Sequence, residues 1–138
     1  MKKIIVLLLI VVSSLNVLGQ SFVGKHKLEI KKEMKENHRD FYFSKEVMGK
    51  SNFIKFEDTD GYRTYLFVLD EDGYCKYHML MCDYSLLKHM IDSLNQSFEY
   101  KENLTWYDYI SGKENFVIRI KKEEWYFSII TKKLDEKD

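Results

Sequence analysis

The chain has 138 residues, with 22 Lys and Arg balanced by 22 Asp and Glu, 15% aromatic residues and no proline. This length fits one domain, and the balanced charge argues against a nucleic-acid binder, which needs a basic excess to neutralise phosphates. An apolar fraction of 45% is too high for a disordered chain.

Residues 1–19 have the pattern of an export signal. Lys2 and Lys3 precede an apolar run over 4–12, and the residues after it favour cleavage between Gly19 and Gln20. The apolar part is shorter than the roughly 20 residues that a membrane-spanning helix needs; the alternative is an uncleaved anchor. We therefore expect a cleaved signal peptide, a periplasmic or secreted bacterial protein, and no transmembrane segment in the remaining chain. That remaining chain has a small acidic excess, because the signal removes two lysines and no acid.

The first helix is expected over 25–38. This segment is rich in Lys and Glu, and Ile30 and Met34 lie on a narrow apolar stripe at helical spacing. Such a stripe is typical of a helix on the protein surface. A short extended segment over 41–43 and a loop containing Gly and Ser follow it.

The Asp-Gly pair at 60–61 predicts a β-hairpin turn between two runs of β-forming residues. A two-residue turn at this point places Ile54 opposite Phe67. It also places Asp58 opposite Arg63, which is a favourable cross-strand charge pair.

A second Asp-Gly pair predicts a further hairpin, for which we expect a three-residue loop over 71–73. This loop places Phe67 opposite Tyr77 and not opposite His78. Because a slip of one residue turns a whole strand face over, the choice decides which side chains are buried. Under this register one sheet face carries Ile54, Phe56, Tyr65, Phe67, Leu69, Cys75, Tyr77, Met79 and Met81.

A second helix is expected from a cap at Asp83 or Ser85 to about Gln96. Its apolar side chains fall in one wide arc, which predicts packing against a sheet, and His89 lies on the opposite, solvent side. Three strand-like runs follow, over 105–110, 115–121 and 125–131.

The pairing of these last three runs is only partly determined by the sequence. Pairing Ile120 with Trp125 gives the last hairpin a coherent apolar face. The connection around 111–112 allows two registers. One register buries Trp106 and Ile110, and the other buries Tyr107 and Tyr109 and exposes Trp106.

The predicted fold class is α+β, built of two αβββ units over about 24–83 and 84–131. A helix with three strands buries too little surface alone, so we expect one antiparallel sheet of six strands, with both helices on one face. The residues 20–138 then form a single domain, with a charged C-terminal tail from about Lys132 that is expected to fray.

This layout resembles the PepSY-like and β-lactamase-inhibitor-like exported modules. The two helices and the meanders at 60–61, 72–73 and 111–112, behind a signal peptide, carry the resemblance. It covers nearly all of the chain after the signal and rests on layout, without a family-specific motif. The resemblance implies a binder or inhibitor of other exported proteins, and it assigns no site residues.

The two cysteines are expected to be buried free thiols. Cys75 and Cys82 lie in one predicted strand, which places them on opposite faces and roughly 23 Å apart, whereas a disulfide needs Cα atoms within about 7 Å. Cys75 would then point away from His78, which we expect to be exposed, so three zinc ligands would not converge. Hairpin turns explain the acids near Asp60 and Asp72, where a calcium loop would need further acids. We expect no metal and no other cofactor.

No catalytic motif is present, so we expect no catalytic residues and no enzyme. The candidate binding residues are Trp106, Tyr107, Asp108 and Tyr109, because strand alternation turns one aromatic pair away from the neighbouring apolar face. Exposed Trp or Tyr beside an acid suits protein recognition or stacking on a sugar ring.

These patterns favour a non-enzymatic protein-interaction or inhibitor-like module of the bacterial envelope, whose partner is another exported protein. A binder of small ligands or glycans through the same aromatic residues is one alternative. An unrecognised hydrolase is the other, and it would require a His, a carboxylate and a hydroxyl to converge in one pocket.

Overall fold

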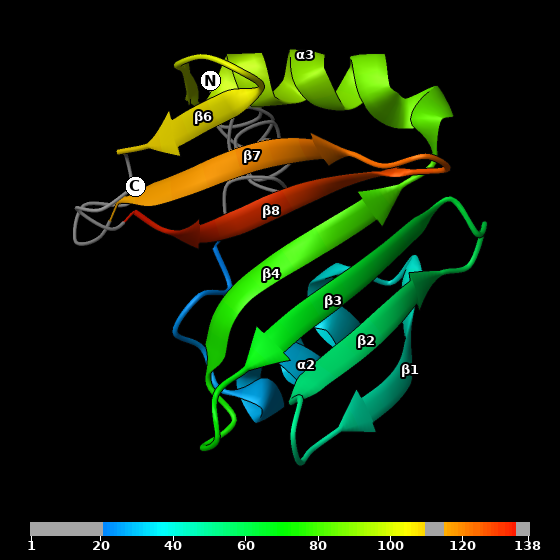
Figure 1. Ribbon diagram of the computed structural model, residues 1–138. Helices are drawn as coiled ribbons and strands as arrows, with labels where there is room; N and C mark the ends of the chain where they lie inside the picture. Colours follow the sequence, from blue (N-terminus) through cyan, green and yellow to red (C-terminus); the bar gives the residue numbers. More distant parts are fainter. Residues whose placement is uncertain (1–20, 110–114, 135–138) are drawn as a thin grey trace, which may run out of the picture.

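The computed structural model describes residues 21–109 and 115–134. Its strands form one eight-stranded antiparallel sheet in the order β1-β2-β3-β4-β8-β7-β6-β5 (Figure 1). The predicted signal peptide, Ile110 and the turn at 111–112 lie outside the described residues. The elements are α2 (Lys27–Asn37), β1 (Phe41–Val47), β2 (Phe53–Asp58), β3 (Arg63–Leu69), β4 (Cys75–Cys82), the short 3-10 helix η1 (Tyr84–Leu86), α3 (Leu87–Ser97), β5 (Glu99–Tyr100), β6 (Thr105–Asp108), β7 (Phe116–Lys122) and β8 (Phe127–Lys133).

The fold class is α+β, as predicted, but each unit has four strands and not three. The segment expected over 41–43 is a full strand, β1, paired with β2 on both sides of a register shift between Phe43 and Lys45. A two-residue strand, β5, pairs with β6. The sequence did not reveal β1 because five of its seven residues are exposed, so it lacks the alternation that marks a half-buried strand.

Both predicted helices are present, and each begins as local chemistry requires. The side chain of His26 accepts a hydrogen bond from the backbone N–H of Leu28 and caps α2. The Asp83 carboxylate accepts from the backbone N–H of Ser85 at 2.9 Å and starts the turn that leads into α3. Among the described residues, no helix is long and apolar enough to cross a bilayer.

The predicted register of the first hairpin is confirmed. Ile54 pairs with Phe67 in the β2–β3 ladder. Arg63 Nε donates to Asp58 Oδ2 at 3.0 Å, so the expected charge pair forms. Gly61 has φ +79°, a left-handed conformation that the tight turn requires and that glycine adopts without strain.

The predicted register of the second hairpin was wrong. The Leu69–Cys75 pair beside the turn forms as expected, but Phe67 lies opposite His78 and not Tyr77. The register shifts next to Leu69, and Lys76 is the extra residue on β4. This β-bulge turns the rest of β4 over. The side chains expected in the core, Tyr77, Met79 and Met81, therefore lie on the opposite face from Phe67.

The last hairpin also has a different register, with less consequence. Ile120 pairs with Ile129 and not with Trp125, which lies in the loop between β7 and β8 and is 80% exposed. The observed partner of Ile120 lies four residues after the predicted one, and a shift by an even number of residues keeps each side chain on its face. The same side chains of β7 and β8 therefore still face the core.

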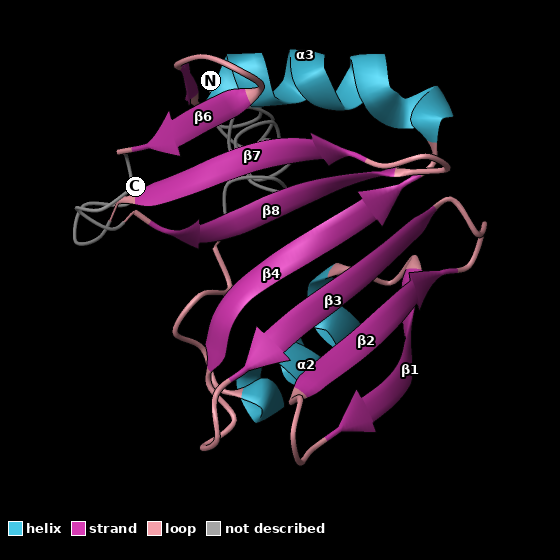
Figure 2. Ribbon diagram, in the orientation of Figure 1, coloured by secondary structure: helices cyan, strands magenta, loops and turns pink. Residues whose placement is uncertain are grey.

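Both helices pack on the same face of the sheet, which we call the covered face. Ile30 and Met34 of α2, with Met90 and Leu94 of α3, belong to one buried apolar cluster with the side chains of that face. Figure 2 shows α2 behind the lower strands and α3 along the top of the sheet. Trp106 is fully buried there, and its Nε1 donates to Asn95 Oδ1 of α3 at 2.8 Å. We call the opposite side of the sheet the open face.

Candidate functional site

The four residues predicted as a binding site do not share one surface. Trp106 and Asp108 lie on the covered face, where both are buried. Tyr107 pairs with Val117 on the other side of the sheet and is partly exposed, and Tyr109, just beyond the end of β6, is 44% exposed. Of the two registers left open by the sequence, the structure contains the one that buries Trp106. Tyr107 and Tyr109 are thus the two aromatic residues of the cluster that solvent reaches.

A cation accompanies these two tyrosines. Lys101 Nζ lies 5.4 Å from the ring centre of Tyr107 and 5.8 Å from that of Tyr109. It also pairs with Glu99 at 3.1 Å, and the hydrogen bond that Lys101 donates to the Glu99 carboxylate raises the pKa of Lys101. The two rings pack edge to face with centroids 5.8 Å apart. Beside them is a polar hollow of about 610 Å³, lined by Lys101, Glu102, Asn103, Thr105, Tyr107 and Arg119.

The centre of the open face carries a patch of apolar side chains that neither described helix covers. Leu66 of β3 pairs with Met79 of β4, and Met79 pairs with Ile130 of β8. In the next cross-strand pair on this face, Val68 lies opposite Tyr77. All these side chains are partly exposed. The open-face patch, as we define it, consists of Leu66, Val68, Tyr77, Met79, Met81 and Ile130.

Charged side chains border the open-face patch at both ends of its central row. Lys55 pairs with Leu66 at one end, and Arg119 pairs with Ile130 at the other. The row therefore runs from a cation through three apolar residues to a second cation. An apolar centre with a polar rim is the usual composition of a protein-protein interface.

Sequence reasoning missed the open-face patch because β4 has apolar residues on both faces. The run from Cys75 to Cys82 offers Tyr77 and Met79 as well as Leu80 for burial. Alternation therefore cannot choose between two registers that differ by one residue. One local feature could have indicated the bulge. Lys76 follows closely after the glycine-containing turn, and a bulge at this position leaves its charged side chain in solvent.

The bulge that turns β4 over also buries His78, for which the sequence predicts exposure. His78 is 5% exposed, and burial lowers its pKa to about 4. The backbone N–H of Phe22 points to its Nε2 at 3.5 Å, and the Phe22 ring packs edge-on against the imidazole. His78 is therefore neutral and acts as an aromatic core residue.

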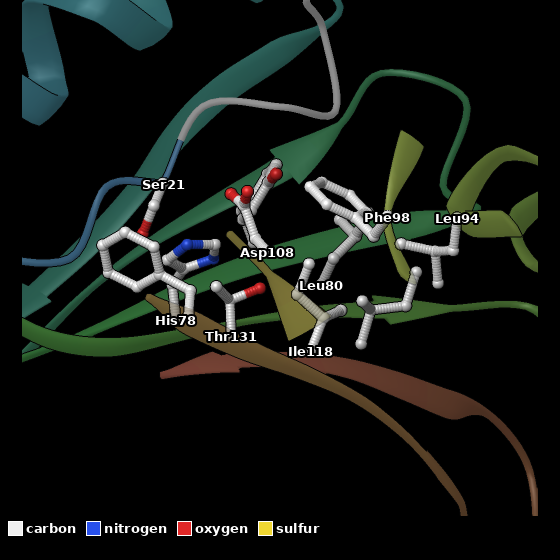
Figure 3. A pocket seen from close by; sticks show the side chains of 11 residues that line it. Ser21, His78, Leu80, Leu94, Phe98, Asp108, Ile118 and Thr131 are labelled. Atoms are coloured by element: carbon white, nitrogen blue, oxygen red, sulfur yellow. The ribbon is translucent and has the colours of Figure 1, made fainter. Parts of the chain in front are cut away.

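A small cavity on the covered face brings several polar groups together (Figure 3). Ser21, His78, Asp108 and Thr131 line it, together with apolar side chains from β4, α3 and β7. A His, a carboxylate and hydroxyls thus share one cavity, which is the condition that the hydrolase alternative required. Its volume is about 40 Å³, which accommodates only water-sized molecules.

The cysteines are buried free thiols, as predicted, but they share one face. The bulge at Lys76 changes the alternation between Cys75 and Cys82, so the argument that Cys75 points away from His78 was wrong. Burial raises the pKa of each thiol to about 12. Within the described residues, no group of three or more His, Cys, Asp or Glu side chains is placed to hold a metal ion.

No protein-family model, curated protein or solved structure matches the chain. What the fold establishes is two successive units of one helix and four strands in a single antiparallel sheet.

Proposed function

We propose that this chain is a non-catalytic binding protein of the bacterial envelope or exterior, and that another exported protein docks on the open-face patch. The observation that supports this proposal best is the position of the patch. Six apolar side chains lie together at the centre of a sheet face that neither described helix covers. Exposed apolar patches of this kind mark interaction sites in soluble proteins.

The composition of the open-face patch suits a protein partner. Met79 and Met81 are flexible and polarizable, so they adapt to a partner's shape, while Tyr77 supplies a large ring with a polar end. Lys55 at the rim already pairs with Glu57 at 3.4 Å, whereas the exposed Arg119 favours an acidic group on the border of the partner. A standard interface buries about 800 Å² on each side, so the partner would extend onto this rim.

The layout supports the same class of function. The repeated unit of a helix followed by antiparallel strands resembles PepSY-like and β-lactamase-inhibitor-like modules, and the pattern over 1–19 is that of an export signal. We therefore place the protein among inhibitor-like or protein-interaction modules. The cavity beside His78 admits only water-sized molecules, which favours binding over catalysis.

Affinity capture from envelope extract tests the proposal. Tagged wild type is compared with Met79→Lys, which places a charge in the centre of the patch, and with His89→Lys, which places the same charge on the exposed side of α3. Wild type and His89→Lys should recover one shared partner that Met79→Lys loses by about tenfold or more. Equal recovery by all three proteins, with Met79→Lys folded by circular dichroism, would contradict it.

A second candidate function is glycan binding beside Tyr107 and Tyr109. The polar hollow next to them offers Lys101, Thr105 and Arg119 for hydrogen bonds to sugar hydroxyls, and exposed tyrosine faces stack on sugar rings. Titration with a panel of neutral and acidic oligosaccharides tests it. Tyr109→Ala should abolish glycan binding. The control variant Tyr126→Ala, at another exposed tyrosine, should retain it.

A further inference from the structure

A second surface, at the far end of the sheet from the glycan candidate, has the features of a peptide-binding groove. It lies between α2 and β1, the strand at one end of the sheet. Its volume is about 380 Å³, within the usual range for ligand sites. The residues that line it are Lys31, Lys35, Phe41, Tyr42, Phe43 and Phe56.

Aromatic rings form the floor of this groove. Phe41 and Phe56 are buried, whereas Phe43 is 48% exposed. Phe43 pairs with Phe56 across the β1–β2 ladder, and their rings pack edge to face with centroids 5.7 Å apart. The exposed Phe43 ring at a sheet edge is an apolar surface that an incoming side chain would cover.

Lysines from α2 form the wall, and no acidic residue lines the groove. Lys31 Nζ lies 5.1 Å from the Phe43 ring centre and pairs with Glu46 at 2.8 Å. The Glu46 carboxylate also forms an ion pair with Lys27 Nζ at 3.5 Å, so two lysines already neutralise its charge. Lys35, one turn along, makes no ion pair with any described residue. The groove therefore has an excess of positive charge, which an acidic ligand would balance.

The floor strand itself offers hydrogen bonds. Among the described residues, β1 pairs with β2 alone, and Figure 1 shows it at one end of the sheet. A free strand edge presents backbone N–H and C=O groups that pair with an added strand. Peptide-binding domains use such an edge beside a helix, where the main chain provides affinity and a side-chain pocket provides specificity.

We propose that this groove binds an extended acidic peptide segment, which pairs with β1 as an additional strand, covers Phe43 with an apolar side chain and places a carboxylate on Lys35. The open edge and the lysine wall together favour a peptide over a small amphiphile, because only a peptide uses the backbone groups of β1. This site is separate from the open-face patch, so one chain would hold two partners or two parts of one partner.

Selection from a displayed library of random peptides, with purified full-length protein as bait, tests the inference. The expected binders contain an acidic residue near an aromatic or aliphatic one and lack proline at their centre, because proline removes a ladder hydrogen bond. Lys35→Glu should remove the preference for acid and weaken the best soluble peptide by about five- to tenfold, measured by fluorescence anisotropy. Lys32→Glu, which makes the same charge change outside the groove, should leave its affinity unchanged.

Further measurements decide between occupants. A centrally proline-substituted version of the peptide should lose binding, and Met79→Lys on the open face should retain it. Any of the following results would overturn the inference: no shared motif among the selected peptides, equal effects of Lys35→Glu and Lys32→Glu, or binding of oleate but of no peptide. Concentration-dependent dimerisation that Lys35→Glu abolishes, without peptide binding, would instead identify a second copy as the occupant and also overturn it.

Discussion

Phe67 lies directly opposite His78 in the central ladder of the sheet, with ring centroids 5.8 Å apart. This pairing follows from one extra residue on β4, Lys76, and it decides the character of both faces. It brings a neutral histidine into the core and turns Met79 and Met81 toward the open face. The proposed docking surface is thus a direct consequence of a single β-bulge.

Acid should destabilise the protein through His78. Its pKa is about 4 in the folded state and 6.5 when unfolded, so the unfolded chain binds more protons between these values. The free energy of unfolding should therefore fall as pH drops from 6.5 to 4, by roughly 3 kcal/mol from this group. His38, whose pKa is lowered by burial, acts in the same direction. Urea unfolding over this pH range measures the slope.

The matched variants for that measurement are His78→Gln and His89→Gln. His78→Gln should flatten most of the slope, leaving the parts due to His38 and to carboxylates such as Glu46, whose pKa is lowered by the hydrogen bond that Lys31 donates to it. His89→Gln, on the exposed side of α3, should keep the full slope. A slope that is unchanged in His78→Gln would show that His78 is not the buried neutral group described above.

The two tryptophans should differ sharply in their contribution to stability. Trp106→Ala removes a fully buried ring and its hydrogen bond to Asn95, at a cost of about 3–5 kcal/mol. Trp125→Ala removes a ring that is 80% exposed and should change stability by about 0.5 kcal/mol or less. Denaturant unfolding followed by circular dichroism compares them. Similar losses in both variants would place Trp106 outside the core.

Arg63 should be the most important cation for stability. Its Nε pairs at 3.0 Å with Asp58, whose side chain is 3% exposed, and its guanidinium also contacts Asp40. Arg63→Met leaves the Asp58 carboxylate buried without its partner, which should cost about 3 kcal/mol. Lys121→Met breaks an exposed pair with Glu123 and should cost about 1 kcal/mol or less. Equal thermal-melting shifts in the two variants would contradict this difference.

Both cysteines should be unreactive in the folded protein. Burial raises the pKa of Cys75 and of Cys82 to about 12, so neither forms a thiolate near neutral pH. A thiol-specific chromogenic reagent should label neither residue in the native state and both after denaturation. Rapid labelling of one thiol in native protein would show that its strand position is accessible.

Local sequence signals predicted the helices, the first hairpin and the α+β class. The Asp60-Gly61 turn fixed the pairing of Ile54 with Phe67, because a two-residue turn leaves no freedom in register. The apolar spacing of Ile30 and Met34 placed the buried stripe of α2, since helical periodicity is a property of the segment alone.

The remaining features depend on contacts that no local pattern encodes. Five of the seven residues of β1 are exposed and the strand shows no alternation, so only its pairing with β2 defines it. The bulge at Lys76 is decided by the packing of His78 against Phe67 and Phe22, which are distant in sequence. For the same reason the open-face patch could not be found in advance, whereas the separation of Trp106 from Tyr107 followed from strand alternation.

Site-specific photo-crosslinking tests whether a partner docks on the open-face patch. A photoreactive phenylalanine analogue is placed at Met79 in the open-face patch, and in a control protein at His89 on α3. After irradiation in envelope extract, the position 79 protein should form one dominant adduct that excess unlabelled wild type suppresses and Met79→Lys does not, while position 89 forms none. The same adducts from both positions, or no adduct at position 79, would contradict docking on the open face.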